Sequence, residues 1–185
     1  MNSTTNSLFG IIALLVANAF FVAAEFALVK ARGPKIESLA AAGSAMATLT
    51  VHIRGHLEAY LAACQLGITM ASLGLGWIGE PAVAALLRPI FEEMGMSEKS
   101  LHTISFLIGF LVFSSLHIVI GEQVPKTFAI RKAETVAIWT AYPLHWFFRV
   151  FFPLNWTLNV ASKGVLNMFR VEEATHGDVY STETV

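Results

Sequence analysis

The chain has 185 residues, of which 55% are hydrophobic and 14% are charged, whereas an average soluble domain has about 25% charged residues. This composition excludes a disordered chain, and the long uninterrupted apolar runs argue against an ordinary soluble globule. The formal net charge of -1 gives no basic excess that would indicate nucleic-acid binding, and the single cysteine, Cys64, cannot form an intrachain disulfide.

The first apolar run covers residues 8–29 and is interrupted by Asn18 and Glu25. At a rise of about 1.5 Å per residue, a helix of this length spans a hydrocarbon core of about 30 Å. Residues 1–7 contain no Lys or Arg, and the run is longer than the core of a secretory signal peptide. We therefore expect a first membrane span that is retained in the protein.

Residues 30–56 are polar and form the predicted connection to the second span. The second apolar run, residues 59–79, contains no charged residue and ends in a glycine-rich segment followed by Pro81. Because glycine and proline weaken a helix, these residues predict a second span that is short or broken after Gly74.

The third apolar run covers residues 101–120 and ends at Gly-Glu-Gln-Val-Pro-Lys, residues 121–126. An interruption of the helix there would free backbone carbonyl groups as ligands. The three apolar runs therefore predict three membrane spans. Lys and Arg concentrate in residues 30–56 and after the third span, so the positive-inside rule predicts an outside N-terminus and a cytoplasmic C-terminus.

Residues 136–170 are apolar and aromatic, but they contain prolines and Arg149. A fourth straight span would bury Arg149 near its middle, at a cost of about 2.5–3.5 kcal/mol on insertion scales. We favour an amphipathic juxtamembrane belt of broken helices on the cytoplasmic side, with a fourth span as the alternative. The expected fold is an all-α integral membrane protein with a three-span core in residues 1–135, and we expect residues 171–185 to be a linker to a cytoplasmic domain.

Polar side chains recur at helical spacing within the three spans, which places each set on one helix face. An ionisable side chain at membrane depth is costly and is a site hypothesis by default. If the three faces converge, their carboxylate, amide and hydroxyl oxygens suit a hard cation such as Mg²⁺, Ca²⁺ or Na⁺ and do not suit zinc or copper. The candidate metal ligands are Asn18 and Glu25 on the first span, Gln65, Thr69 and Ser72 on the second, and Glu122 on the third.

Each candidate ligand also has a structural explanation. Hydroxyl groups in membrane helices often bond to the backbone or to a neighbouring helix, and an amide such as that of Gln65 packs between helices in the same way. Glu25 and Glu122 could extend to the inner interface and pair with a basic side chain. No catalytic triad, phosphate-binding glycine loop or redox motif is present in the sequence, so we do not expect an enzyme.

Three segments resemble the sequence of a known family, namely FFVAAEFAL at 20–28, QLGITMASLGLGWIGEP at 65–81 and GEQVPKT at 121–127. The chain resembles the transmembrane domain of the CNNM/CorC family, in its bacterial branch long labelled hemolysin-like, over nearly its whole length. The resemblance implies a three-span domain that forms a homodimer through the membrane and is associated with Mg²⁺ transport, commonly described as Na⁺-coupled export. Full-length members continue into cytoplasmic CBS domains that bind ATP, and we expect such domains beyond the C-terminus.

The resemblance also implies roles for individual residues. The family's cation site uses a Ser before the first-span Glu, polar side chains on the second span, and the Glu of the Gly-Glu-x-x-Pro-Lys element. These positions correspond to Glu25, Ser72 and Glu122 of this chain. Ala24 and Ile68 stand where two further oxygen donors are typical. Neighbouring polar side chains of the second span, or backbone carbonyls, are the available substitutes.

Two functions remain open at this point. The first is a Mg²⁺ transporter domain of the cell (inner) membrane, with Na⁺ as the coupling ion and a cation site that opens toward the cytoplasm. The second is a membrane anchor that dimerises and presents cytoplasmic domains without transporting an ion. Stabilisation by Mg²⁺ that is lost in a Glu122 variant would favour the first, because a ligand that binds only the folded state raises its stability.

Overall fold

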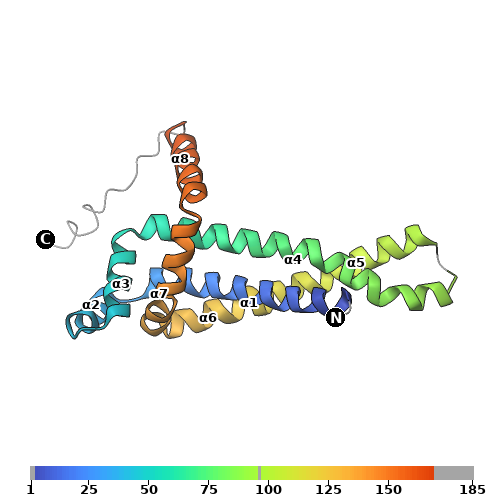
Figure 1. Ribbon diagram of the computed structural model, residues 1–185, viewed down its shortest axis with the longest axis horizontal. Helices are drawn as coiled ribbons and strands as arrows, with labels where there is room; N and C mark the ends of the chain where they lie inside the picture. The colour runs from blue at the N-terminus through green and yellow to red at the C-terminus, as the bar shows by residue number, and fades with distance from the viewer. Residues whose placement is uncertain (1–2, 96, 169–185) are drawn as a thin grey trace, which may run out of the picture.

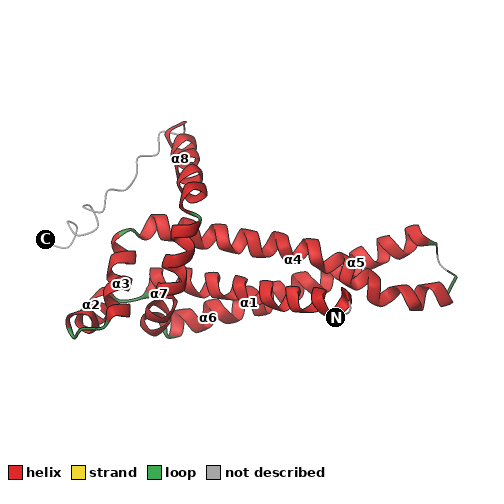
Figure 2. Cartoon of the chain, viewed as in Figure 1, coloured by secondary structure: helices red, strands yellow, loops and turns green. Residues whose placement is uncertain are grey.

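The structure is a computed structural model that describes residues 3–95 and 97–168. All secondary structure in these residues is helical (Figure 2), which confirms the predicted all-α class. In Figure 1 the long helices run along the long axis, with α2, α3 and α7 gathered at one end and the connection between α4 and α5 at the other. The predicted linker, residues 171–185, lies outside the described residues.

Three helical segments of the described chain are long and apolar enough to cross a membrane, as predicted. Large apolar side chains on their outer faces, such as Phe9, Leu73 and Phe110, are exposed, which suits helices that are surrounded by lipid. The first segment is Thr5–Lys30 within α1 (Ser3–Lys30), and the second is Leu57–Ile90 within α4 (Leu57–Glu93). The third, Glu98–Arg131, comprises α5 (Glu98–Leu116), η1 (His117–Gln123) and α6 (Val124–Arg131).

The second span is continuous, and the predicted break after Gly74 is wrong, because α4 is one helix of 37 residues. Its glycines allow close packing against neighbouring helices instead of ending the helix. A Cβ atom on Gly67 would lie 2.5 Å from the ring of Phe21, and one on Gly79 would lie 2.6 Å from the ring of Phe113. In a membrane, small residues at such positions let helix backbones approach one another.

The third span changes its hydrogen-bonding pattern where the sequence predicts an interruption. Residues His117–Gln123 form a π-helix, η1, between the two α-helical parts of the span. In a π-helix the backbone N–H bonds to the carbonyl five residues earlier, and such turns are rare and frequent at functional sites. The chain therefore continues as a helix through Gly121, but with a different placement of side chains from that of an α-helix.

The predicted cytoplasmic connection, residues 30–56, forms two short helices, α2 (Gly33–Ala41) and α3 (Ala45–Gly55). The hydroxyl of Ser44 caps α3 by accepting a hydrogen bond from the backbone N–H of Ala47. Both helices pack at the end of the bundle where α1 finishes, α2 against α3 and α3 against α7.

The predicted belt region forms α7 (Ala133–Val150) and α8 (Phe152–Met168), and neither helix is among the three candidate spans. In Figure 1, α8 runs across the long axis of the three spans. Exposed Trp146 and Trp156 lie on these two helices, as expected for side chains that prefer the membrane interface. The location of this belt on the cytoplasmic side stays a prediction.

The larger hydrophobic core lies where α7 packs against α1 and α3. Its fully buried side chains include Leu28, Ile53 and Leu144. Tyr60 of α4 is also buried in this core, and its hydroxyl is hydrogen-bonded to Nδ1 of His145 on α7. This core fixes the C-terminal part of α1 and the first turns of α4 relative to each other, which positions the site described next.

Candidate functional site

Polar side chains from all three spans meet at one cavity of about 270 Å³. Glu25 of α1, Gln65 of α4 and Glu122 of η1 line it, together with Lys126 of α6. The structure therefore brings together three of the six candidate ligands, each from a different span. Their donors to a metal ion are carboxylate and amide oxygens, the set that hard cations prefer.

Glu25 and Gln65 contact each other directly. The amide Nε2 of Gln65 donates a hydrogen bond to Oε1 of Glu25, with a donor–acceptor distance of 2.6 Å. Gly67, two residues after Gln65, packs closely on the ring of Phe21, four residues before Glu25, and this packing holds α1 and α4 near enough for the contact. The second carboxylate oxygen of Glu25 and the amide oxygen of Gln65 remain able to accept further bonds.

Glu122 is bonded to His117, a residue that the sequence did not single out. Nε2 of His117 lies 2.7 Å from Oε1 of Glu122, so the imidazole N–H donates to the carboxylate. The two residues are five apart, a spacing that separates side chains on an α-helix but brings them together on a π-helix. The only sequence signal is therefore a histidine shortly before the predicted interruption and a glutamate within it.

Lys126 brings a positive charge to the same cavity. Its Nζ atom lies 4.6 Å from the centre of the Phe26 ring, an arrangement in which the ring face attracts the ammonium group. Lys126 also follows Glu122 by one helical turn. The cavity thus holds two carboxylates and one ammonium group, and the walls between them are apolar, as at Ile68.

Asn18 connects the three spans beside this cavity. It is 1% exposed, and its Nδ2 donates a hydrogen bond of 2.9 Å to the carbonyl of Gly121 in η1. The hydroxyl of Ser72 lies 3.5 Å from Oδ1 of Asn18 and donates a shorter bond, 2.8 Å, to the carbonyl of Ile68. In this structure Asn18 and Ser72 therefore hold helices together, and neither is among the residues that line the cavity of Glu25 and Glu122.

Thr69 lies apart from this group. Its side chain is exposed, and its hydroxyl donates a hydrogen bond of 2.8 Å to the carbonyl of Gln65, one turn earlier in α4. Such a bond is common for threonine within a helix. A role for Thr69 as a metal ligand stays a prediction.

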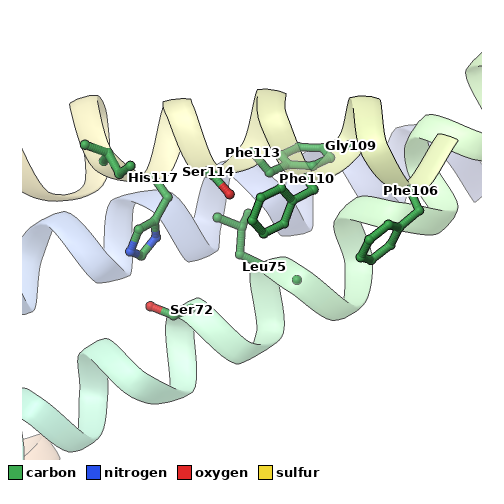
Figure 3. Close-up of a pocket in the computed structure, with 10 residues that line it drawn as sticks. Ser72, Leu75, Phe106, Gly109, Phe110, Phe113, Ser114 and His117 are labelled. Carbon is green, nitrogen blue, oxygen red and sulfur yellow. The ribbon is translucent and has the colours of Figure 1, made fainter. Parts of the chain in front are cut away.

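A second, more apolar cavity of about 410 Å³ lies between α4 and α5. Figure 3 shows the rings of Phe106 and Phe110 along it, with Ser72 and His117 at one end. His117 is therefore shared, because it borders the apolar cavity and also bonds the carboxylate that lines the polar one. The described residues contain no group of three His, Cys, Asp or Glu side chains placed to hold a metal ion.

The family profile described as "Cyclin M transmembrane N-terminal domain", CNNM, matches residues 9–185. The chain belongs to the CNNM family. This CNNM chain is 41% identical over 180 residues to UPF0053 protein YrkA of Bacillus subtilis (strain 168), a match that covers 97% of this chain and 42% of that protein. The three segments on which the resemblance rested all lie within the CNNM match.

Two further relatives also match nearly the whole of this CNNM chain and less than half of their own length. UPF0053 protein YhdP of Bacillus subtilis (strain 168) is 41% identical over 174 residues, covering 94% of this chain and 39% of that protein. UPF0053 protein sll0260 of Synechocystis sp. (strain ATCC 27184 / PCC 6803 / Kazusa) is 32% identical over 172 residues, covering 92% of this chain and 38% of that protein. The chain thus spans about two fifths of the length of these relatives.

Proposed function

We propose that this CNNM membrane domain transports a divalent cation, with Mg²⁺ as the cargo, through the cavity lined by Glu25, Gln65 and Glu122. The observation that supports this proposal is that each of the three spans contributes one of these oxygen-bearing side chains to a single cavity. The cavity has two carboxylates and one ammonium group, and the excess negative charge is costly within membrane-spanning segments. A bound cation would offset that cost.

The chemistry of the donor set favours Mg²⁺. This ion dehydrates reluctantly, keeps several of its waters, and is usually held through one or two carboxylates. A water molecule occupies about 30 Å³ in the liquid, so a cavity of about 270 Å³ has room for the ion and several waters. The small number of protein ligands is then compatible with Mg²⁺ binding.

The other groups of the cavity have defined tasks in this proposal. The hydrogen bonds from Gln65 and His117 orient one oxygen of each carboxylate and leave the other oxygen to face the ion. Lys126 offsets one of the two carboxylate charges when no cation is bound, and the bound ion takes over that role. Coupling to Na⁺, an opening toward the cytoplasm and a homodimer are further parts of the proposal, suggested by the family resemblance.

The test is a Mg²⁺ titration of the purified chain with thermal unfolding as the readout. At a free Mg²⁺ concentration of about 100 times Kd, binding to the folded state adds about 2.7 kcal/mol of stability. Glu122→Gln and Glu25→Gln should each abolish this gain. Glu58→Gln removes an exposed carboxylate near the start of α4 and should retain the gain, which makes it the matched control. Saturable Mg²⁺ binding by Glu122→Gln at wild-type affinity would contradict the proposal.

A non-transporting membrane anchor is the second candidate function. Two observations favour it. Ala24 is completely buried in the core, and Ile68 presents an apolar side chain to the cavity, although both positions carry oxygen donors in the family pattern. If this function is correct, Mg²⁺ leaves the unfolding temperature of the wild-type chain unchanged, and liposomes containing the chain show no Mg²⁺ flux.

A further inference from the structure

A cavity of about 650 Å³ lies at the end of the bundle where α1 and α6 finish and α2 and α7 begin. It is separate from the cavity of Glu25 and Glu122, and the proposed cation transport makes no use of it. Its walls carry basic side chains from four different segments and one carboxylate. The charged side chains that line it are Lys30, Arg32, Lys35, Arg131 and Glu134.

This basic cavity lies at the ends of two candidate spans, where lipid headgroups are expected. The first and third candidate spans, Thr5–Lys30 and Glu98–Arg131, end at residues that line it. On α7, which begins at the cavity, Trp139, Tyr142 and Trp146 are half or more exposed. Their spacing of three and four residues places them on one helix face, as expected for a helix that lies in the interface with its aromatic side chains among the headgroups.

The positive charge in the basic cavity is only partly offset. Glu134 is its one carboxylate, and it forms an ion pair with Lys35 at 3.7 Å. A hydrogen bond from its own backbone N–H, followed by the attraction of Lys35 and Arg32, holds the pKa of Glu134 below its usual value. Lys30, Arg32 and Arg131 therefore leave the cavity with an excess of positive charge, which favours an anion.

The start of α2 adds to this attraction. Arg32 stands at the N-cap of α2 without a capping side-chain hydrogen bond, and Arg32, Pro34 and Lys35 all line the cavity. The first N–H groups of a helix and its dipole favour negative charge. Basic residues at the cytoplasmic ends of spans also direct membrane orientation, but that role does not require them to surround a cavity.

We infer that this basic cavity binds the phosphate group of an anionic phospholipid. The geometry suits that ligand because the charge lies at headgroup depth, beside apolar helix faces along which acyl chains can extend. Basic pockets between membrane helices on the cytoplasmic side are a recognised way to bind such headgroups. A soluble phosphate would use the same charges but would gain nothing from the neighbouring lipid-facing surface.

The experiment measures equilibrium binding of phosphatidylglycerol to the detergent-purified full chain, with phosphatidylcholine as the comparison lipid. Each basic residue near an anionic membrane surface strengthens attraction by about a factor of five. Arg32→Gln and Arg131→Gln should therefore each weaken phosphatidylglycerol binding about fivefold. Glu134→Gln removes the opposing charge and should tighten binding, an effect that partial unfolding would not produce.

Lys132→Gln is the matched control. Lys132 is exposed and adjacent to Arg131 but does not line the cavity, so its replacement should leave binding unchanged. Weakening by Lys132→Gln equal to that by Arg131→Gln would show a diffuse surface effect and overturn the inference. Equal affinity for phosphatidylcholine would also overturn it. So would displacement of phosphatidylglycerol by an equal concentration of inorganic phosphate, because that result would identify a soluble anion as the ligand.

Discussion

Gly121 offers a direct test of the packing that holds η1 against α1. A Cβ atom at this position would lie 2.8 Å from Nδ2 of Asn18, closer than real side chains approach. Asn18 is buried and already donates a hydrogen bond to the carbonyl of the same glycine, so it has little freedom to move aside. Gly121→Ala should therefore push η1 and α1 apart and break this bond.

The expected cost follows from these contacts. Overpacking a tight site typically costs about 1–3 kcal/mol, and an interhelical hydrogen bond in a membrane protein contributes about 0.6 kcal/mol on average. Replacing glycine with alanine within a helix returns about 0.5–1 kcal/mol. The net destabilisation of Gly121→Ala should be about 1–3 kcal/mol.

Gly76→Ala is the matched control for Gly121→Ala, because a Cβ atom on Gly76 would contact nothing within 4 Å. This variant should be as stable as the wild type or slightly more stable. Unfolding by a denaturing detergent, followed by tryptophan fluorescence, gives the free energy of unfolding for each variant. Equal free energies for the two variants would refute the reasoning, because the contact between Gly121 and Asn18 would then have no energetic consequence.

Two further predictions concern the α1–α4 contact and the α7 core. Gly67→Ala places a Cβ atom 2.5 Å from the Phe21 ring and should lower the free energy of unfolding by about 1–3 kcal/mol relative to Gly76→Ala. The same detergent unfolding assay measures this difference, and equal values for the two variants would contradict the prediction. Burial, the largest cause, lowers the pKa of His145 below its ordinary value of about 6.5. As pH falls below about 6.5, the unfolded chain therefore takes up a proton that the folded chain resists, so stability is complete above that pH and declines below it. The unfolding temperature should drop between about pH 7.5 and about pH 5.5, and His145→Gln should reduce that drop; a drop of the same size in the variant would exclude this histidine as the cause.

The positions of the three spans could be predicted from sequence because lipid imposes a simple requirement. A helix must supply about 20 consecutive apolar residues to cross the hydrocarbon core, and the chain meets this requirement three times. The sequence also raised a meeting of the three polar faces as a condition for a site, and Glu25, Gln65 and Glu122 do line one cavity. Each lies on a polar stripe, and polar stripes of membrane helices face one another instead of lipid.

The continuity of α4 could not be predicted from its glycines. In water, a segment such as residues 74–81 favours a break, because glycine gains conformational freedom when a helix ends. In a membrane the backbone groups that would be freed have no water to bond, so the helix is retained. What distinguishes a glycine that breaks a helix from one that allows close packing is its neighbour in the fold. Gly67 and Gly79 each face an aromatic ring from another span.

His117 was missed for a related reason. The predicted polar stripes have α-helical spacing, on which residues five apart lie on different faces. The contact between His117 and Glu122 exists only because the backbone between them is a π-helix. The local sequence contains no established signature of that π-helix, although the predicted interruption at residues 121–126 was close to it.

The π-helix determines how the two α-helical parts of the third span are rotated relative to each other. Each residue of an α-helix turns the chain by about 100°, so if η1 regained α-helical hydrogen bonding, Glu122 would rotate away from His117 while α5 kept its place in the bundle. The hydrogen-bonding pattern of these seven residues therefore decides which helix face carries the carboxylate. The π-helix thus sets the rotation of α6 relative to α5, and with it the side of the third span from which the carboxylate reaches the cavity.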